Sequence, residues 1–175
     1  MAGQYTETAF EAGIEEHLLT YGGYQKRTTK TFDPGLCLDT EIFLQFIQTT
    51  QPEEWQYLVR LRKDKAAETL LDDLCRALDS EHEGCLKVLR HGFKCFGKTF
   101  RTAYFAPASG LNPETERLYE ANILSVTRQV RYAKHHTKTL DMVLSLNGIP
   151  IITAELKNHM TGQTRTDAIY QYKHD

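Results

Sequence analysis

Two apolar segments rich in β-branched residues surround a turn signal in the last quarter of the chain. Together they form the stretch 140–158, LDMVLSLNGIPIITAELKN, with Asn147 and Gly148 between them. An Asn-Gly pair flanked by such segments is the strongest short-range signal for a β-hairpin, because both residues tolerate the positive φ angles of a tight turn. The pattern therefore predicts two paired strands, around which the other elements are organised.

The beginning of the chain has helical spacing instead. A stripe of apolar residues recurs at every fourth position within residues 6–21, namely Phe10, Ile14 and Leu18. This spacing predicts an amphipathic helix that ends at Gly22-Gly23. Glu11 and Glu15 lie on the adjoining flank, where two solvated glutamates are the ordinary expectation.

The middle of the chain is dominated by helical periodicity. From Asp39 to about His91, apolar residues repeat at intervals of three and four, and Pro52 and Asp79-Ser80 divide the pattern into several helices. A turn at Asp33-Pro34-Gly35 precedes this region. We interpret residues 33–112 as a mostly helical insertion and not as a separate enzyme.

Shorter elements flank and follow the insertion. We predict strands within 24–32, at 98–105 and at 123–132, a loop at 107–113, a helix at 114–121, and a last helix that begins at Asp167 with Thr166 as its cap. The length of 175 residues suffices for one domain, 1–175, with a sizeable core.

Composition narrows the class of protein. Hydrophobic residues make up 41% and charged residues 25%, which is typical of a soluble globular protein. The chain contains neither a run of about 20 apolar residues nor the blocks of a signal peptide, so we expect a cytoplasmic protein without a membrane partner. Four cysteines, Cys37, Cys75, Cys85 and Cys95, form no CxxC pair. We expect reduced thiols in the core and no structural zinc.

Three charged residues interrupt the apolar hairpin. Glu155 and Lys157 share one face of the second strand, because side chains alternate along a strand. Whether Asp141 joins them depends on the turn. In a two-residue loop Leu146 pairs with Ile149 and Asp141 faces away, whereas a three-residue loop with a bulge and a left-handed Gly148 shifts the parity by one. We expect the bulge.

Two carboxylates on paired strands lie close enough for one divalent cation to bridge them. Asp141 and Glu155 supply hard oxygen ligands, which select Mg²⁺ or Mn²⁺. Lys157 beside such an ion could orient or deprotonate an attacking water and stabilise charge on a phosphate. Phosphodiester hydrolysis is the chemistry that this pattern favours.

These residues carry a resemblance to a known family. Asp141, about a dozen residues, and then Glu155-x-Lys157 resemble the PD-(D/E)xK nuclease signature, although Leu140 replaces its proline. The surrounding motifs resemble the N-terminal domain of the restriction (R) subunit of type I restriction-modification enzymes. They are NPETERLYEAN at 112–122, TRQVRY at 127–132, TGQT at 161–164 and DAIYQYKHD at 167–175.

The resemblance implies an α/β restriction-endonuclease-like fold, a mixed sheet flanked by helices, that cleaves double-stranded DNA with Mg²⁺. It also implies that Gln171 supports positioning and that Glu11 approaches the metal. The chain then resembles an amino-terminal fragment of a longer protein that acts with specificity and methyltransferase subunits. ATP would be used only by motor domains absent from this chain, since no GxxxxGK[ST] motif occurs here.

Basic residues near the predicted site suggest DNA backbone contacts. We assign this role to Arg128, Arg131, Lys134 and Lys138, whereas His135 and His136 are poor metal candidates because neighbouring side chains point apart. A second basic run, 87–101, is either a solvated face or a phosphate-contacting edge. An alternative to catalysis is an inert nuclease-fold module that grips DNA or docks a subunit.

Overall fold

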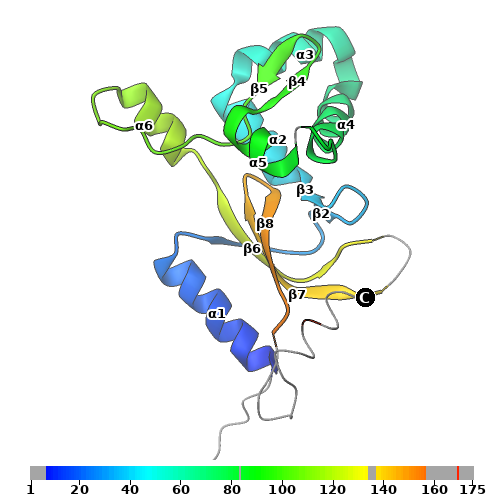
Figure 1. The fold of residues 1–175 in the computed structure, drawn as a ribbon, viewed down its shortest axis with the longest axis vertical. Helices are drawn as coiled ribbons and strands as arrows, with labels where there is room; N and C mark the ends of the chain where they lie inside the picture. Colours follow the sequence, from blue (N-terminus) through cyan, green and yellow to red (C-terminus); the bar gives the residue numbers. More distant parts are fainter. Residues whose placement is uncertain (1–6, 83, 134–136, 157–168, 170–175) are drawn as a thin grey trace, which may run out of the picture. The chain divides into compact units, whose positions relative to one another are not determined.

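The computed structural model describes residues 7–82, 84–133, 137–156 and 169 (Figure 1). The chain divides into two compact units. We call the first, formed by Met1–Leu38 and Leu124–Asp175, the core unit, and the second, formed by Asp39–Ile123, the helical unit. Each is described by itself.

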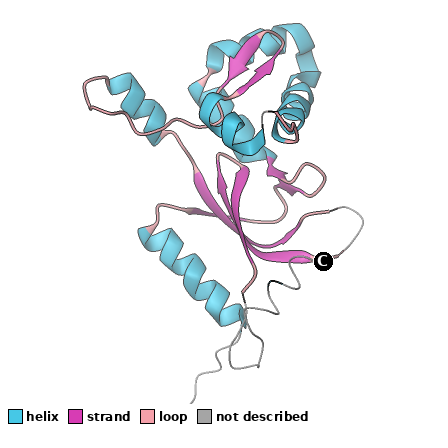
Figure 2. Cartoon of the chain, in the orientation of Figure 1, coloured by secondary structure: helices cyan, strands magenta, loops and turns pink. Residues whose placement is uncertain are grey.

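A four-stranded sheet forms the centre of the core unit (Figure 2). Its strands are β1 (Gln25–Arg27), β6 (Leu124–Arg131), β7 (Thr139–Leu146) and β8 (Ile149–Ala154), in the order β1-β6-β7-β8. β1 runs parallel to β6, whereas the β6-β7 and β7-β8 pairs are antiparallel. The predicted mixed sheet and the predicted hairpin are therefore confirmed.

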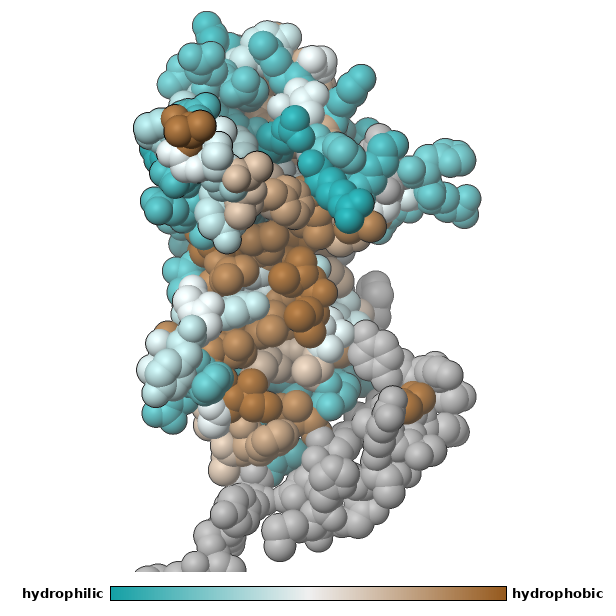
Figure 3. All heavy atoms as spheres, turned by 60° about the vertical axis from the view of Figure 1, so that its left-hand side comes forward, coloured by the Kyte–Doolittle hydropathy of each residue, from teal (hydrophilic) through white to brown (hydrophobic). Residues whose placement is uncertain are grey.

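The helix α1 (Glu7–Tyr21) packs against β1 and β6, and its buried face only partly coincides with the stripe that the sequence pattern predicted. Glu11 and Glu15 are its buried residues, whereas Ile14 and Leu18 are half-buried and Phe10 is 54% exposed. Figure 3 shows hydrophobic side chains, in brown, on the surface of this unit. The expectation of two solvated glutamates was wrong, because basic partners on the sheet compensate the buried carboxylates, as described below.

The turn between β7 and β8 also differs in detail from the prediction. Leu146 pairs with Ile149, and both Asn147 (φ 51°) and Gly148 (φ 81°) are left-handed, so the loop has two residues and not three. This geometry matches the right-handed twist of the strands. The expected loop length was therefore wrong, although Gly148 is left-handed as predicted.

The bulge occurs one step further along the hairpin. Ser145 pairs with Pro150 but Leu144 pairs with Ile152, which leaves Ile151 as the extra residue. Pro150 suits an irregular position, because it cannot donate a ladder hydrogen bond. The parity shift that we predicted is confirmed, since every pair beyond Ile151 is displaced by one residue.

The helical unit contains the helices that the periodicity predicted. They are α2 (Thr40–Thr50), α3 (Pro52–Arg62), the short 3-10 helix η1 (Lys63–Lys65), α4 (Ala66–Leu78), α5 (Gly84–His91) and α6 (Pro113–Glu120). Asp39 caps α2 by accepting the N–H of Ile42, and Pro52 occupies the first turn of α3, where no amide donor is needed. Buried side chains such as Phe43, Leu70 and Leu74 fill its core.

The structure contains two short hairpins that the sequence analysis did not predict. β2 (Phe32–Asp33) pairs with β3 (Leu38–Asp39) across the expected turn, in which an Asp33 carboxylate oxygen accepts the N–H of Gly35 at 2.7 Å. β4 (Phe93–Cys95) pairs with β5 (Lys98–Phe100) inside the basic run. Its turn places Phe96 at φ 48°, a conformation for which phenylalanine gives no sequence signal.

The four cysteines are free thiols, as expected, but only Cys95 belongs to the core. Cys37 and Cys85 are exposed and Cys75 is half-buried. Burial, together with a hydrogen bond to Asp73, raises the pKa of Cys95 to about 12. No helix among the described residues combines the length and apolar character that crossing a bilayer requires.

The register of the hairpin can be tested by cross-linking. Met142→Cys with Ala154→Cys should form a disulfide on mild oxidation, because these residues are direct partners and the Cα atoms of such a pair lie about 4.5–5.5 Å apart. Cys37, Cys75 and Cys85 are first replaced by serine, and the cross-link is measured by peptide mass spectrometry. The matched control is Met142→Cys with Thr153→Cys, the pair that a hairpin without the bulge would bring together. Preferential cross-linking of this control would contradict the bulge.

Candidate active site

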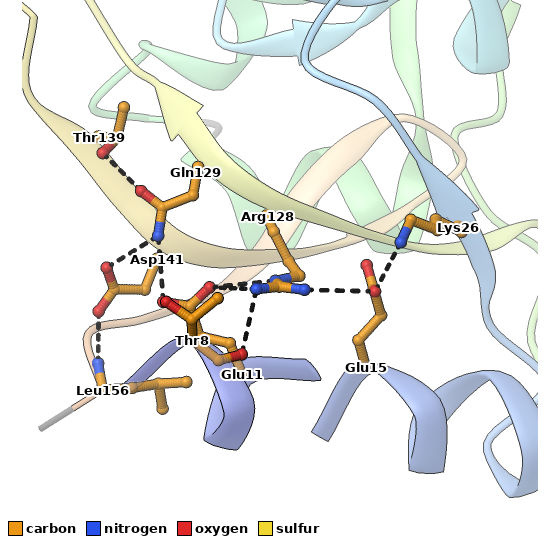
Figure 4. A network of polar contacts seen from close by, with 9 residues as sticks. All are labelled: Thr8, Glu11, Glu15, Lys26, Arg128, Gln129, Thr139, Asp141 and Leu156. Atoms are coloured by element: carbon orange, nitrogen blue, oxygen red, sulfur yellow. Dashed lines mark hydrogen bonds and ion pairs between the residues drawn. The ribbon is translucent and has the colours of Figure 1, made fainter. Parts of the chain in front are cut away.

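A continuous polar network joins α1 to three strands of the core unit (Figure 4). It connects side chains of α1, β1, β6 and β7 and ends at the backbone directly after β8. It contains Glu11 and Asp141, two of the residues that the sequence assigned to the active site. The remaining members are residues to which the sequence gave another role or none.

Arg128 of β6 lies at the centre of this network. Its Nε and one terminal nitrogen donate to the same carboxylate oxygen of Glu11 at 3.0 and 2.8 Å, and its other terminal nitrogen lies 3.6 Å from Glu15. One guanidinium therefore serves two carboxylates from successive turns of α1. A planar guanidinium with five N–H donors in a fixed geometry is well suited to this role.

Lys26 of β1 supplies the second positive charge. Its ammonium donates to Glu15 Oε2 at 2.7 Å, although the lysine side chain is itself 59% exposed. The two glutamates and the two basic residues balance in formal charge. Because burying an unpaired carboxylate costs several kcal/mol, this balance explains why α1 can turn its acidic face inward.

Gln129 follows Arg128 and continues the network toward β7. Its backbone is left-handed, with φ 53°, although the residue lies inside a strand. Figure 4 shows the side chains of Arg128 and Gln129 both directed toward α1, which a regular strand would not allow for neighbours. The Gln129 amide nitrogen donates to Glu11 Oε1 at 3.1 Å and to Asp141 Oδ1 at 3.4 Å, and its oxygen accepts from Thr139.

Asp141 connects β7 to the end of β8. Its second oxygen, Oδ2, accepts the backbone N–H of Leu156 at 2.7 Å. Met142 pairs with Ala154, and continuing this register by one residue puts Asp141 opposite Glu155. Residues directly opposite each other project from the same face, with Cβ atoms about 4.5–5.5 Å apart. The bulge at Ile151 is therefore what aligns the two acidic positions.

Three predicted site residues lie outside the described residues, namely Lys134, Lys157 and Gln171, as do His135 and His136. Ile169, in the predicted last helix, is helical. Arg131 and Lys138 are exposed, at the end of β6 and just before β7. Arg128 differs from them, because its guanidinium is directed to Glu11 and Glu15 and is only 21% exposed.

Among the described residues, no group of three or more His, Cys, Asp and Glu side chains could hold a metal ion. The register nevertheless offers two carboxylates, those of Asp141 and Glu155. Mg²⁺ keeps several waters and commonly takes only one or two protein carboxylates. The oxygen ligands of this pair therefore suit Mg²⁺. The Gln129 amide nitrogen that donates to Asp141 also donates to the carboxylate of Glu11.

The sheet and its flanking elements define a class. The helices and the four-stranded mixed sheet agree with the restriction-endonuclease-like α/β fold that the sequence predicted. The chain belongs to the family described as type I restriction enzyme R protein N terminus, whose model matches residues 42–175. The resemblance seen in the sequence is thereby confirmed. No curated protein and no solved structure matched significantly.

Sequence reasoning missed the roles of Lys26, Thr139 and Gln129, and it assigned Arg128 to DNA. One signal was available for Arg128, since a glutamate pair at i, i+4 on a helix flank requires a basic partner if that flank is buried. No signal existed for Gln129, because glutamine has no preference for a left-handed backbone.

The network predicts a large difference between its two basic residues. Arg128→Ala leaves Glu11 and Glu15 buried without their shared partner, so the core unit should lose about 3–5 kcal/mol of unfolding free energy. Lys26→Ala is the matched control and should cost about 1 kcal/mol or less, because the lysine is 59% exposed and Arg128 stays beside Glu15 in this variant.

Hydrogen exchange of the β6 and β7 amides measures this free energy for the core unit. The fluorescence of Trp55, the only tryptophan, reports on the helical unit and should be unaffected. Equal losses for the two variants would show that Arg128 does not hold α1 in place.

Proposed function

We propose that this domain is the Mg²⁺-dependent endonuclease of a type I restriction enzyme and hydrolyses phosphodiester bonds of double-stranded DNA. The observation that carries the proposal is the displaced register of β7 and β8, in which Met142 pairs with Ala154. Continued by one residue, this register puts Asp141 opposite Glu155. Without the bulge at Ile151, Asp141 would oppose Ala154. Family membership supports the same reading.

In this proposal Asp141 and Glu155 would hold the ion. A bound Mg²⁺ or Mn²⁺ supplies a water of lowered pKa and positive charge beside the phosphate. The protein's own contribution is to fix the oxygens beforehand. Asp141 Oδ2 is held by the N–H of Leu156, and Oδ1 by the Gln129 amide. Such outer contacts orient a carboxylate and limit the reorganisation needed on binding.

We assign the remaining roles from the motif positions. Lys157 would orient or deprotonate the attacking water and stabilise the charge that develops on the phosphate. Gln171 would support positioning. Glu11 would act from a distance, because one of its oxygens is bound by Arg128 and the other by Gln129.

Family membership supports the partners that we propose. Double-stranded DNA would be the substrate, and specificity and methyltransferase subunits would complete the restriction-modification complex. Arg131, Lys134 and Lys138 are the proposed contacts to the DNA backbone. Arg128 is better suited to holding Glu11 and Glu15. The negative charges of these two carboxylates offset the positive charge of the guanidinium, so its attraction for a phosphate is weak. ATP would be consumed by motor domains outside this chain.

The decisive experiment measures DNA cleavage and ATP hydrolysis side by side in the restriction enzyme that contains this domain. Asp141→Ala, Glu155→Ala and Lys157→Ala should each lower cleavage of supercoiled plasmid about a thousandfold or more, because residues that act as one unit fail together. For the same reason the double variants should be little worse than the single ones. ATP hydrolysis should survive in all of them.

Asp64→Ala, an exposed substitution in η1, is the control and should cleave normally. Chelation with EDTA should stop cleavage by the wild type, and added Mg²⁺ should restore it. Cleavage retained in Glu155→Ala would rule out this active site. Loss of both activities together would instead favour an inert module that docks or grips DNA.

A further inference from the structure

The backbone of Gln129 is strained in the middle of β6. Among the described strand residues of β6, Gln129 alone has a positive φ, and a residue with a side chain in this region costs about 1–2 kcal/mol. Such strain persists only where the surroundings impose it, and it concentrates at functional sites. The pairing of β6 with β7 continues on both sides, since Arg128 pairs with Met142 and Val130 with Leu140. The left-handed backbone of Gln129 therefore changes the direction of its side chain and leaves the register of the two strands unchanged.

The chemistry around the Gln129 amide fixes its orientation. Ionised carboxylates only accept hydrogen bonds, so the end that faces Glu11 and Asp141 must be the nitrogen, which has two N–H donors. The oxygen then points to the Thr139 hydroxyl, which can donate, at 3.1 Å. All three contacts agree with a single orientation.

The position of this amide is equally informative. Glu11 belongs to α1 and Asp141 to β7, and their carboxylates would repel each other if they approached without a donor between them. Arg128 binds the other oxygen of Glu11, and Leu156 N–H binds the other oxygen of Asp141. The amide of Gln129 is thus a neutral bridge that sets the separation of two carboxylates from different elements.

We propose that Gln129 is a positioning residue of the nuclease site: its amide, aimed by a strained backbone and by Thr139, fixes the carboxylates of Glu11 and Asp141 and thereby sets the affinity for the divalent ion. This inference rests on the proposed function and adds a residue to it. Groups that orient metal ligands through hydrogen bonds commonly change metal affinity about 10-fold to 100-fold when they are replaced.

The test is Mn²⁺ binding to the 175-residue chain, measured by electron paramagnetic resonance of the free ion, together with melting temperatures without metal. Gln129→Met keeps the length of the side chain and removes the donors, so Mn²⁺ should bind about tenfold or more weakly. Thr139→Val removes the hydroxyl and should weaken binding in the same direction but less. Thr139→Ser, which keeps the hydroxyl, should recover it.

Two controls separate positioning from stability. Val126→Ala, a core substitution on the same strand, should lower the melting temperature without changing Mn²⁺ affinity. Gln25→Asn, an exposed amide on β1, should change neither.

The possible outcomes test the role of Gln129 separately from the proposed nuclease function. If the wild type binds Mn²⁺ and Asp141→Asn abolishes binding, but Gln129→Met binds within twofold of the wild type, the inference is overturned and the proposed function stands. If the wild type does not bind Mn²⁺, both are overturned. Should Gln129→Met fail to fold, the pair Thr139→Val and Thr139→Ser decides, and equal affinity in those two variants overturns the inference.

Discussion

The burial of two glutamates against one arginine is the interaction on which the core unit depends. Removing two carboxylates from water costs several kcal/mol each, and only a partner with several directed donors offsets that cost at two sites at once. Arg128 therefore fixes the rotation of α1 about its own axis as well as its distance from β6. The same rotation presents Glu11 to Gln129, so an ion pair contributes to the approach of α1 to the candidate site.

A single extra residue has a comparable effect on the hairpin. Because side chains alternate with a period of two, the displacement at Ile151 transfers every later residue of β8 to the opposite pairing. Continued by one residue, the displaced register puts Asp141 opposite Glu155 instead of Ala154. The two devices are independent: one directs a helix and the other directs a strand, and both converge on the carboxylate of Asp141.

Strong local signals predicted most of the fold. Asn147-Gly148, the helical spacing between residues 39 and 91, and the alternation of β6 all gave elements that the structure contains, and the family motifs identified the domain. The failures have physical causes. The buried face of α1 depends on Arg128, which lies 117 residues from Glu11 in the sequence. The periodicity of a helix contains no information about such a distant partner. The left-handed residues Phe96 and Gln129 are imposed by their surroundings, so their residue types gave no indication.

The core unit is discontinuous in sequence, because residues on both sides of the helical unit contribute to it. β1 pairs with β6 over a separation of roughly one hundred residues, with Gln25 beside Ser125. A ribosome adds about 5–20 residues each second, so β6 is synthesised about 5–20 s after β1. Contacts within the helical unit are local and can form earlier. The candidate site can therefore assemble only after the helical unit has been synthesised. During synthesis, the nascent chain passes through a period in which α1, with its two glutamates, still lacks the arginine that neutralises them.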